Sequence, residues 1–254
     1  MLNTILTGTA TDSPPLLIAH GLFGSARNWG SIAKRMAADR QVITVDMRNH
    51  GESPWFDTHS YPDMAADLAE VIAANGGQAD VLGHSMGGKA AMMLALTAPE
   101  RINRLVVADI APVAYRHSQQ PLIDAMRGVD LSAVETRSDA DEMLARAVES
   151  RPVRAFLLQS LDVKNRRWQL NLDVLEAEMS KILGWPQVEG RFDGPTLFLS
   201  GAESDYVRPE FRDDIAALFP KARFVSISGA GHWLHAEKPR EFITTLQTAL
   251  PAAA

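Results

Sequence analysis

Cysteine is absent from the 254 residues of the sequence. This absence excludes disulfide bonds, thiolate metal ligands and a cysteine nucleophile, and it is typical of proteins in a reducing compartment. The chain also lacks an excess of basic residues, because its formal net charge is −6. Without a basic surface, the protein is not expected to bind nucleic acid or an anionic membrane.

Long hydrophobic runs and a leader pattern are missing as well. The longest apolar run, Ala90–Leu96, is far shorter than the roughly 20 residues that span a bilayer. The first residues, Met1–Thr4, contain neither the basic nor the apolar region of a secretory signal. We therefore expect a cytoplasmic protein. Its share of 46% apolar and 22% charged residues is typical of a globular domain, here long enough for one domain with an insertion.

Short apolar runs alternate with longer segments in which apolar residues recur at helical spacing. Continuous apolar runs are typical of buried parallel strands, so this alternation predicts an α/β fold with a mostly parallel central sheet flanked by helices. The expected strands are Leu16–Ala19, Gln41–Asp46, Ala79–Leu82, Arg104–Ala108, Thr196–Leu199 and Arg223–Ile227. The expected helices between them are Ser31–Ala38, Met64–Ala74, Met86–Thr97, Glu210–Leu218 and Pro239–Leu250.

The alternation stops after about residue 110, where no strand pattern is found until residue 196. Two helical stretches, Asp139–Val148 and Val153–Leu161, follow one another in this region. We therefore expect a core formed by residues 1–110 and 191–254, with residues 111–190 inserted as a helical cap over the sheet.

A Gly-x-Ser-x-Gly pattern, centred on Ser85, lies between a predicted strand and a predicted helix. A serine at such a sharp turn has a strained backbone, and the small residues Gly83 and Gly87 avoid steric clashes around it. The pattern predicts Ser85 as a catalytic nucleophile.

The same stretch also matches most of a phosphate-binding P-loop, with Gly83, Gly88 and Lys89 at the required spacing. A P-loop needs Ser or Thr after the lysine to hold Mg²⁺, and this chain has Ala90. A nucleotide-binding protein is therefore the weaker interpretation.

A catalytic serine needs a histidine base, and the base needs an acid, in the chain order Ser, acid, His. His232 follows the last predicted strand and suits this order, while His235 is the fallback. Two carboxylates could supply the acid, because Asp109 and Asp205 each follow a predicted strand. No metal-ligand pattern such as His-Glu-x-x-His is present, so neither a metal nor another cofactor is expected.

The oxyanion of the reaction needs backbone N–H donors close to the serine. In a strand-turn-helix nucleophile site one donor is the residue after the serine, here Met86. The second is expected from the loop at residues 20–24, where Leu22 is the first candidate and Phe23 the other.

With these residues assigned, the chain resembles the single-domain esterases of the YbfF type and their mitochondrial relatives. The resemblance implies an α/β-hydrolase fold, with a helical cap inserted after the sixth strand. It also implies hydrolysis of esters or thioesters with small or medium acyl chains, and it favours Asp109 over Asp205 as the acid. The motifs that carry it are His20–Gly24, Asp46–Gly51, Gly83–Gly88, Asp109–Pro112 and Gly231–Pro239.

The cap is expected to shape the acyl pocket. Arg48 and His50 are expected to be structural, with substrate-anion binding by the arginine as the alternative. Carbon–carbon bond hydrolases, perhydrolases and acyltransferases share the serine arrangement, and a non-catalytic binding protein on the same fold is a further alternative. Apolar candidates for the pocket wall are Phe156, Leu157, Trp168, Trp185 and Trp233.

Overall fold

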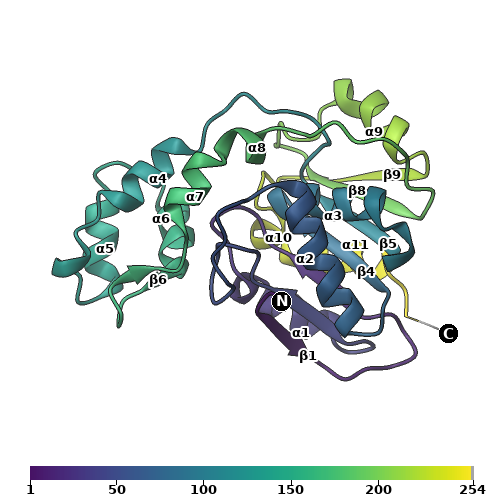
Figure 1. Cartoon of the computed structure of the whole chain (residues 1–254), viewed down its shortest axis with the longest axis horizontal. Coiled ribbons are helices and arrows are strands. Elements are labelled where there is room, and N and C mark those ends of the chain that lie inside the picture. Colours follow the sequence, from purple (N-terminus) through teal and green to yellow (C-terminus); the bar gives the residue numbers. More distant parts are fainter. Residues whose placement is uncertain (253–254) are drawn as a thin grey trace.

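A seven-stranded sheet forms the centre of the protein in a computed structural model that describes residues 1–252 (Figure 1). The strand order is β1-β3-β2-β4-β5-β8-β9, in which β1 pairs antiparallel with β3 and all other neighbours are parallel. The predicted α/β fold with a mostly parallel sheet is confirmed. The strands are β1 (Thr4–Thr7), β2 (Leu16–Ala19), β3 (Val42–Val45), β4 (Ala79–His84), β5 (Ile102–Ala108), β8 (Thr196–Gly201) and β9 (Ala222–Ile227).

Helices cover both faces of the sheet. Successive side chains of a strand point to opposite faces, and in a strand such as β2 all of them are apolar and buried. In β2, Leu17 and Ala19 pack in the cluster that contains α2, α3 and α9, whereas Leu16 and Ile18 pack in the cluster that contains α1, α10 and α11. The helices are α1 (Gly30–Met36), α2 (Tyr61–Ala74), α3 (Met86–Thr97), α9 (Arg212–Leu218), α10 (Leu234–Glu237) and α11 (Pro239–Ala249). The carboxyl ends of the parallel strands meet at one edge, which is where sites form in such sheets.

A helical segment lies between β5 and β8. Figure 1 shows α4, α5, α6 and β6 together on one side of the sheet, with α8 leading back towards it. The elements of this segment are α4 (Gln120–Arg127), α5 (Arg137–Leu144), α6 (Arg151–Leu157), β6 (Leu161–Asp162), β7 (Arg167–Trp168), α7 (Leu172–Ala177) and α8 (Met179–Leu183).

The segment follows the fifth strand of the chain and not the sixth, so this part of the expectation was wrong. The four strands predicted before the insertion and one antiparallel edge strand, β1, make five, and the described residues contain no further strand ahead of the segment.

Candidate active site

Ser85 lies at the tip of the turn between β4 and α3. Its backbone has φ 53° and ψ −121°, a conformation that residues other than glycine seldom adopt. A Cβ atom at Gly83 would lie 2.2 Å from the Gly87 carbonyl oxygen, and one at Gly87 would lie 2.4 Å from the Ala19 carbonyl oxygen. Both glycines are therefore required for the turn that exposes the serine hydroxyl.

His232 reaches this serine from the loop between β9 and α10. The Ser85 hydroxyl lies 3.1 Å from the His232 Nε2 atom, which is within hydrogen-bond distance. Nε2 of the buried His84 lies 2.9 Å from the His232 carbonyl oxygen and ties the loop to the end of β4. A hydroxyl that donates to a neutral imidazole is the arrangement from which histidine removes a proton.

Asp109 supplies the carboxylate next to His232. Its Oδ2 atom lies 2.7 Å from His232 Nδ1, and the residue is fully buried directly after β5. Its Oδ1 atom accepts a hydrogen bond of 3.0 Å from the Gly201 N–H, and the Ser204 hydroxyl also donates to Oδ2. Asp205 is exposed, and no hydrogen bond among residues 1–252 joins it to His232. Of the two predicted acids, the structure thus brings only Asp109 to the imidazole.

Two of the predicted oxyanion donors have no hydrogen-bond acceptor among the described residues. Met86 is the first residue of α3, so its N–H has no acceptor within the helix. The Leu22 N–H makes no hydrogen bond to any of residues 1–252. The Phe23 N–H, by contrast, donates to His50 Nε2 at 3.1 Å and is already occupied. Of the three predicted donors, the structure thus leaves the Leu22 and Met86 N–H groups without an acceptor among residues 1–252 and gives one to Phe23.

A cavity of about 100 Å³ opens in front of the serine. Of the five predicted pocket residues, Phe156 and Trp233 line it. The prediction does not hold for Leu157, Trp168 and Trp185. Leu157 and Trp168 are buried in the hydrophobic core, and the Trp168 Nε1–H donates to the Met126 carbonyl oxygen at 2.9 Å; Trp185 packs near the ring of Tyr61.

Lys89 is one helical turn beyond Ser85 on α3 and lines the same cavity. It is 1% exposed, and burial lowers its pKa to about 7. Its ammonium donates to the carbonyl oxygens of Leu183 and Gly184 at 3.0 and 2.6 Å, at the end of α8. The lysine of the P-loop pattern therefore joins the inserted segment to the core. Since its ammonium is bonded to protein carbonyl oxygens and not free for a phosphate, the nucleotide-binding interpretation is wrong.

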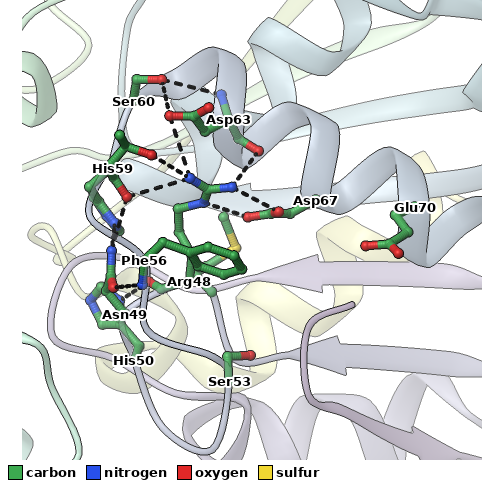
Figure 2. Close-up of polar contacts among 12 residues, drawn as sticks. Arg48, Asn49, His50, Ser53, Phe56, His59, Ser60, Asp63, Asp67 and Glu70 are labelled. Atoms are coloured by element: carbon green, nitrogen blue, oxygen red, sulfur yellow. Dashed lines mark hydrogen bonds and ion pairs between the residues drawn. The ribbon is translucent and has the colours of Figure 1, made fainter.

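Arg48 makes a complete set of contacts within the protein (Figure 2). Its Nε and Nη2 atoms donate to the two carboxylate oxygens of Asp67 at 2.6 and 2.9 Å. Nη1 donates to Thr58 Oγ1 at 3.0 Å, and the guanidinium lies 4.6 Å from the centre of the Phe56 ring. Through these contacts Arg48 joins the loop after β3 to α2. Because it does not line the cavity and its donors are occupied, it is not available to a substrate anion.

Several contacts of the site had no local pattern from which they could be predicted. The Tyr115 hydroxyl donates to the Tyr206 carbonyl oxygen at 2.6 Å, and the Tyr206 hydroxyl lies 2.7 Å from His117 Nε2. Together with Ser204 and Lys89, these residues come from segments far apart in the chain. Asp205 was one of the two predicted acids, but its neighbours in the chain make the contacts: Ser204 donates to Asp109, and the Tyr206 carbonyl oxygen accepts from Tyr115.

The described residues contain neither a metal-ligand cluster nor a helix that could span a membrane. Between residues 1 and 252 no group of three or more His, Asp or Glu side chains is arranged to hold a metal ion. Over the same range, none of the helices combines the length and the apolar character needed to cross a bilayer.

A mostly parallel sheet with a strained serine after β4, a histidine after the last strand and a buried aspartate beside it defines the class of α/β-hydrolases. The chain belongs to this family, because the family model described as "alpha/beta hydrolase fold" matches residues 14–239.

Similar proteins agree with this assignment. The "sn-1-specific diacylglycerol lipase ABHD11" of Mus musculus is 42% identical over 257 residues, which covers 97% of this chain and 83% of the relative. The "Esterase YbfF" of Escherichia coli is 42% identical over 232 residues, which covers 90% of this chain and 89% of the relative. A solved structure described as "Marine microorganism esterase" has a TM-score of 0.92 and 37% identity, covering 98% of this chain and 100% of that one.

Proposed function

We propose that this protein is a serine esterase that hydrolyses carboxylic esters through an acyl-enzyme. Ser85 is the nucleophile, His232 the base and Asp109 the acid. The observation that carries the proposal is the continuous hydrogen-bonded series from Ser85 Oγ to His232 Nε2 at 3.1 Å and from His232 Nδ1 to Asp109 Oδ2 at 2.7 Å.

The first half of the reaction forms the acyl-enzyme. His232 Nε2 takes the hydroxyl proton while Ser85 Oγ bonds to the ester carbonyl carbon. The negative charge that develops on the carbonyl oxygen is stabilised by the N–H groups of Leu22 and Met86. The imidazolium then gives its proton to the alkoxide as the bond to the leaving group breaks, and the alcohol departs.

The second half releases the acid. A water molecule gives a proton to His232 Nε2 as its oxygen attacks the acyl carbon, and the same two amides stabilise the oxyanion. When the bond to Ser85 Oγ breaks, the serine regains a proton from the imidazolium. Asp109 remains ionised and holds the Nδ1–H tautomer of His232 throughout.

The cavity favours short acyl groups. Its volume of about 100 Å³ is smaller than the roughly 150 Å³ cavity that holds benzene in an engineered protein. Phe156, Leu122 and Ile182 give it apolar walls suited to an alkyl chain. Oxygen esters and thioesters follow the same chemical steps, so we extend the proposal to acyl thioesters of similar size. The names of the relatives, an esterase and a diacylglycerol lipase, support the ester class.

We also propose that residues 111–190 act as a cap that forms one wall of this cavity. Leu122, Phe156 and Leu183 from this segment line the cavity together with Ser85 from the core. A cytoplasmic location stays a prediction of the sequence.

Labelling with a fluorophosphonate probe tests the nucleophile. The wild type is expected to be labelled at Ser85 and to hydrolyse p-nitrophenyl esters of short chains, while Ser85→Ala is expected to lose both properties, with kcat falling about 10⁶-fold. Panels of p-nitrophenyl and acyl-CoA substrates of increasing chain length then define the acyl preference. Turnover close to wild type in purified Ser85→Ala would contradict the proposal.

A further inference from the structure

The oxyanion turn at residues 21–24 contains an unusual backbone conformation. The Gly24 N–H donates to the Gly21 carbonyl oxygen at 3.0 Å and closes a four-residue turn. Phe23, the third residue of this turn, has φ 64°, a conformation that favours glycine or asparagine. Because a phenylalanine is strained there, contacts from outside the turn must hold it in this conformation.

Those contacts come from two other segments. The Phe23 N–H donates to His50 Nε2 at 3.1 Å, and the Phe23 carbonyl oxygen accepts from the Ser160 hydroxyl at 2.9 Å. On the other side of Leu22, the Gly21 carbonyl oxygen lies 2.8 Å from His20 Nδ1. Both peptide groups that flank Leu22 are therefore fixed by imidazoles.

The hydrogen bonds of His50 determine its tautomer. His50 Nδ1 lies 2.8 Å from the Arg48 carbonyl oxygen, which can only accept, so Nδ1 carries the proton. Nε2 then has a free lone pair and can accept from Phe23. His50 is fully buried, and the rings of His20 and His59 lie 5.1 and 5.5 Å from it. Burial and these two neighbours lower the pKa of His50 well below its usual value, which keeps the acceptor neutral.

The segment that carries His50 is itself anchored (Figure 2). Arg48 is bonded to Asp67 on α2, and its charge also faces Asp63, whose carboxylate lies 3.4 Å away. The Asn49 side chain accepts from the Phe56 N–H at 2.8 Å. The segment next to His50 is thus fixed by its own contacts, and the second ring nitrogen of His50 accepts from the oxyanion turn.

We propose that His50 is a positioning residue of the oxyanion hole: by accepting the Phe23 N–H it holds the strained turn in which the Leu22 N–H stays free for the oxyanion. This inference rests on the proposed function for its catalytic consequence. A misplaced Leu22 amide weakens binding of the transition state more than binding of the substrate, because the oxyanion exists only in the former.

Two substitutions separate the hydrogen bond from packing. His50→Phe keeps a buried ring but removes the acceptor, and His50→Gln can offer its side-chain oxygen as a replacement. We expect His50→Phe to lower kcat at least about tenfold, since loss of a whole oxyanion donor costs about 10²- to 10³-fold, while KM changes about twofold or less. Affinity for a boronic acid, which mimics the tetrahedral state, should fall by the same factor as kcat. His50→Gln should recover most of both.

Asn103→Ala serves as the matched control for lost stability. Asn103 donates to the buried Asp80 at 2.8 Å near the amino ends of β4 and β5, at the opposite edge of the sheet. The Asn103→Ala variant should have a lower melting temperature than the wild type but the same kcat and the same affinity for the boronic acid. Full kcat in His50→Phe, or equal losses in the Phe and Gln variants, would overturn the positioning role.

A second readout does not depend on ester hydrolysis. In protein labelled with ¹⁵N at histidine, His50 is expected to show the Nδ1–H tautomer and to remain neutral at pH 6.5, where an ordinary histidine is half protonated. The opposite tautomer, or a protonated His50 at that pH, would overturn the inference. Absence of any ester hydrolysis by the wild type would instead refute the proposed function while leaving this readout in force.

Discussion

The ring of Tyr206 lies almost parallel to the ring of His232, with 4.0 Å between the centres and 20° between the planes. During turnover His232 becomes an imidazolium, and a cation over an aromatic face is stabilised by about 0.5–2 kcal/mol. We therefore expect Tyr206→Leu to lower kcat by about two- to thirtyfold. Tyr206→Phe keeps the stack and loses only the hydroxyl contact with His117, so it should stay within about twofold of wild type. Steady-state kinetics measure both effects. Equal kcat values for the two variants would contradict a stabilising effect of the stack on the imidazolium.

Asp109→Asn and Asp205→Asn compare the two predicted acids. The first replaces the carboxylate that accepts from His232 Nδ1, and an amide there disfavours the required tautomer, so we expect kcat to fall about 10⁴-fold. The second changes an exposed side chain and should leave kcat within about twofold. A large loss in Asp205→Asn with little loss in Asp109→Asn would show that the acid has been assigned to the wrong residue.

Lys89→Met tests the contact between Lys89 and the inserted segment through the pH dependence of the melting temperature. Burial lowers the pKa of Lys89 to about 7, whereas a lysine in the unfolded chain has a pKa of about 10.4. Between these values the unfolded state binds more protons, so this group makes stability rise with pH. We expect the melting temperature of the wild type, relative to Lys89→Met, to increase from about pH 7 to about pH 9.

Lys221→Met is the control for this measurement, because Lys221 is exposed. Its melting temperature should follow that of the wild type at every pH. A difference between wild type and Lys89→Met that does not change with pH would mean that Lys89 keeps its proton in the folded protein.

His235→Phe addresses stability in acid. Burial and the nearby His232 lower the pKa of His235 to about 4, while an unfolded histidine has a pKa of about 6.5. As pH falls from about 6.5 to 4, the unfolded chain gains a proton that the folded protein refuses, and stability is lost. The variant should therefore lose less stability over this range. It also removes the buried Nδ1 atom, which has no hydrogen-bond partner among residues 1–252, and phenylalanine can keep the stack on Trp29. If the melting temperatures of the wild type and His235→Phe fall equally between about pH 6.5 and 4, this expectation is contradicted.

The sequence indicated the parallel strands and the nucleophile turn because their signals are local. Leu16–Ala19 and Met86–Thr97 were predicted with the bounds that β2 and α3 have. The edge strand β1 was missed because it is half-exposed, has one partner and shows no continuous apolar run. The choice between Asp109 and Asp205 could not be made locally, since both follow neighbouring strands and the difference lies in burial and loop conformation.

Other parts of the site depend on contacts that no local pattern encodes. The sequence presents Lys89 only as part of a P-loop pattern, because its partners Leu183 and Gly184 lie more than 90 residues further along the chain. Trp168 and Trp185 were predicted in the pocket from their size and apolar character, which packing in the hydrophobic core requires equally.

The inserted segment leaves the sheet at the end of β5 and returns at the start of β8, and these two strands are hydrogen-bonded neighbours. The segment therefore begins and ends beside the same pair of neighbouring strands and lies between no other pair. The strand pairing of the sheet does not depend on the length of this segment, but the Ser160 hydroxyl of the segment bonds to the Phe23 carbonyl oxygen beside the serine. A change in the segment that alters the acyl pocket therefore also reaches the turn that carries Leu22.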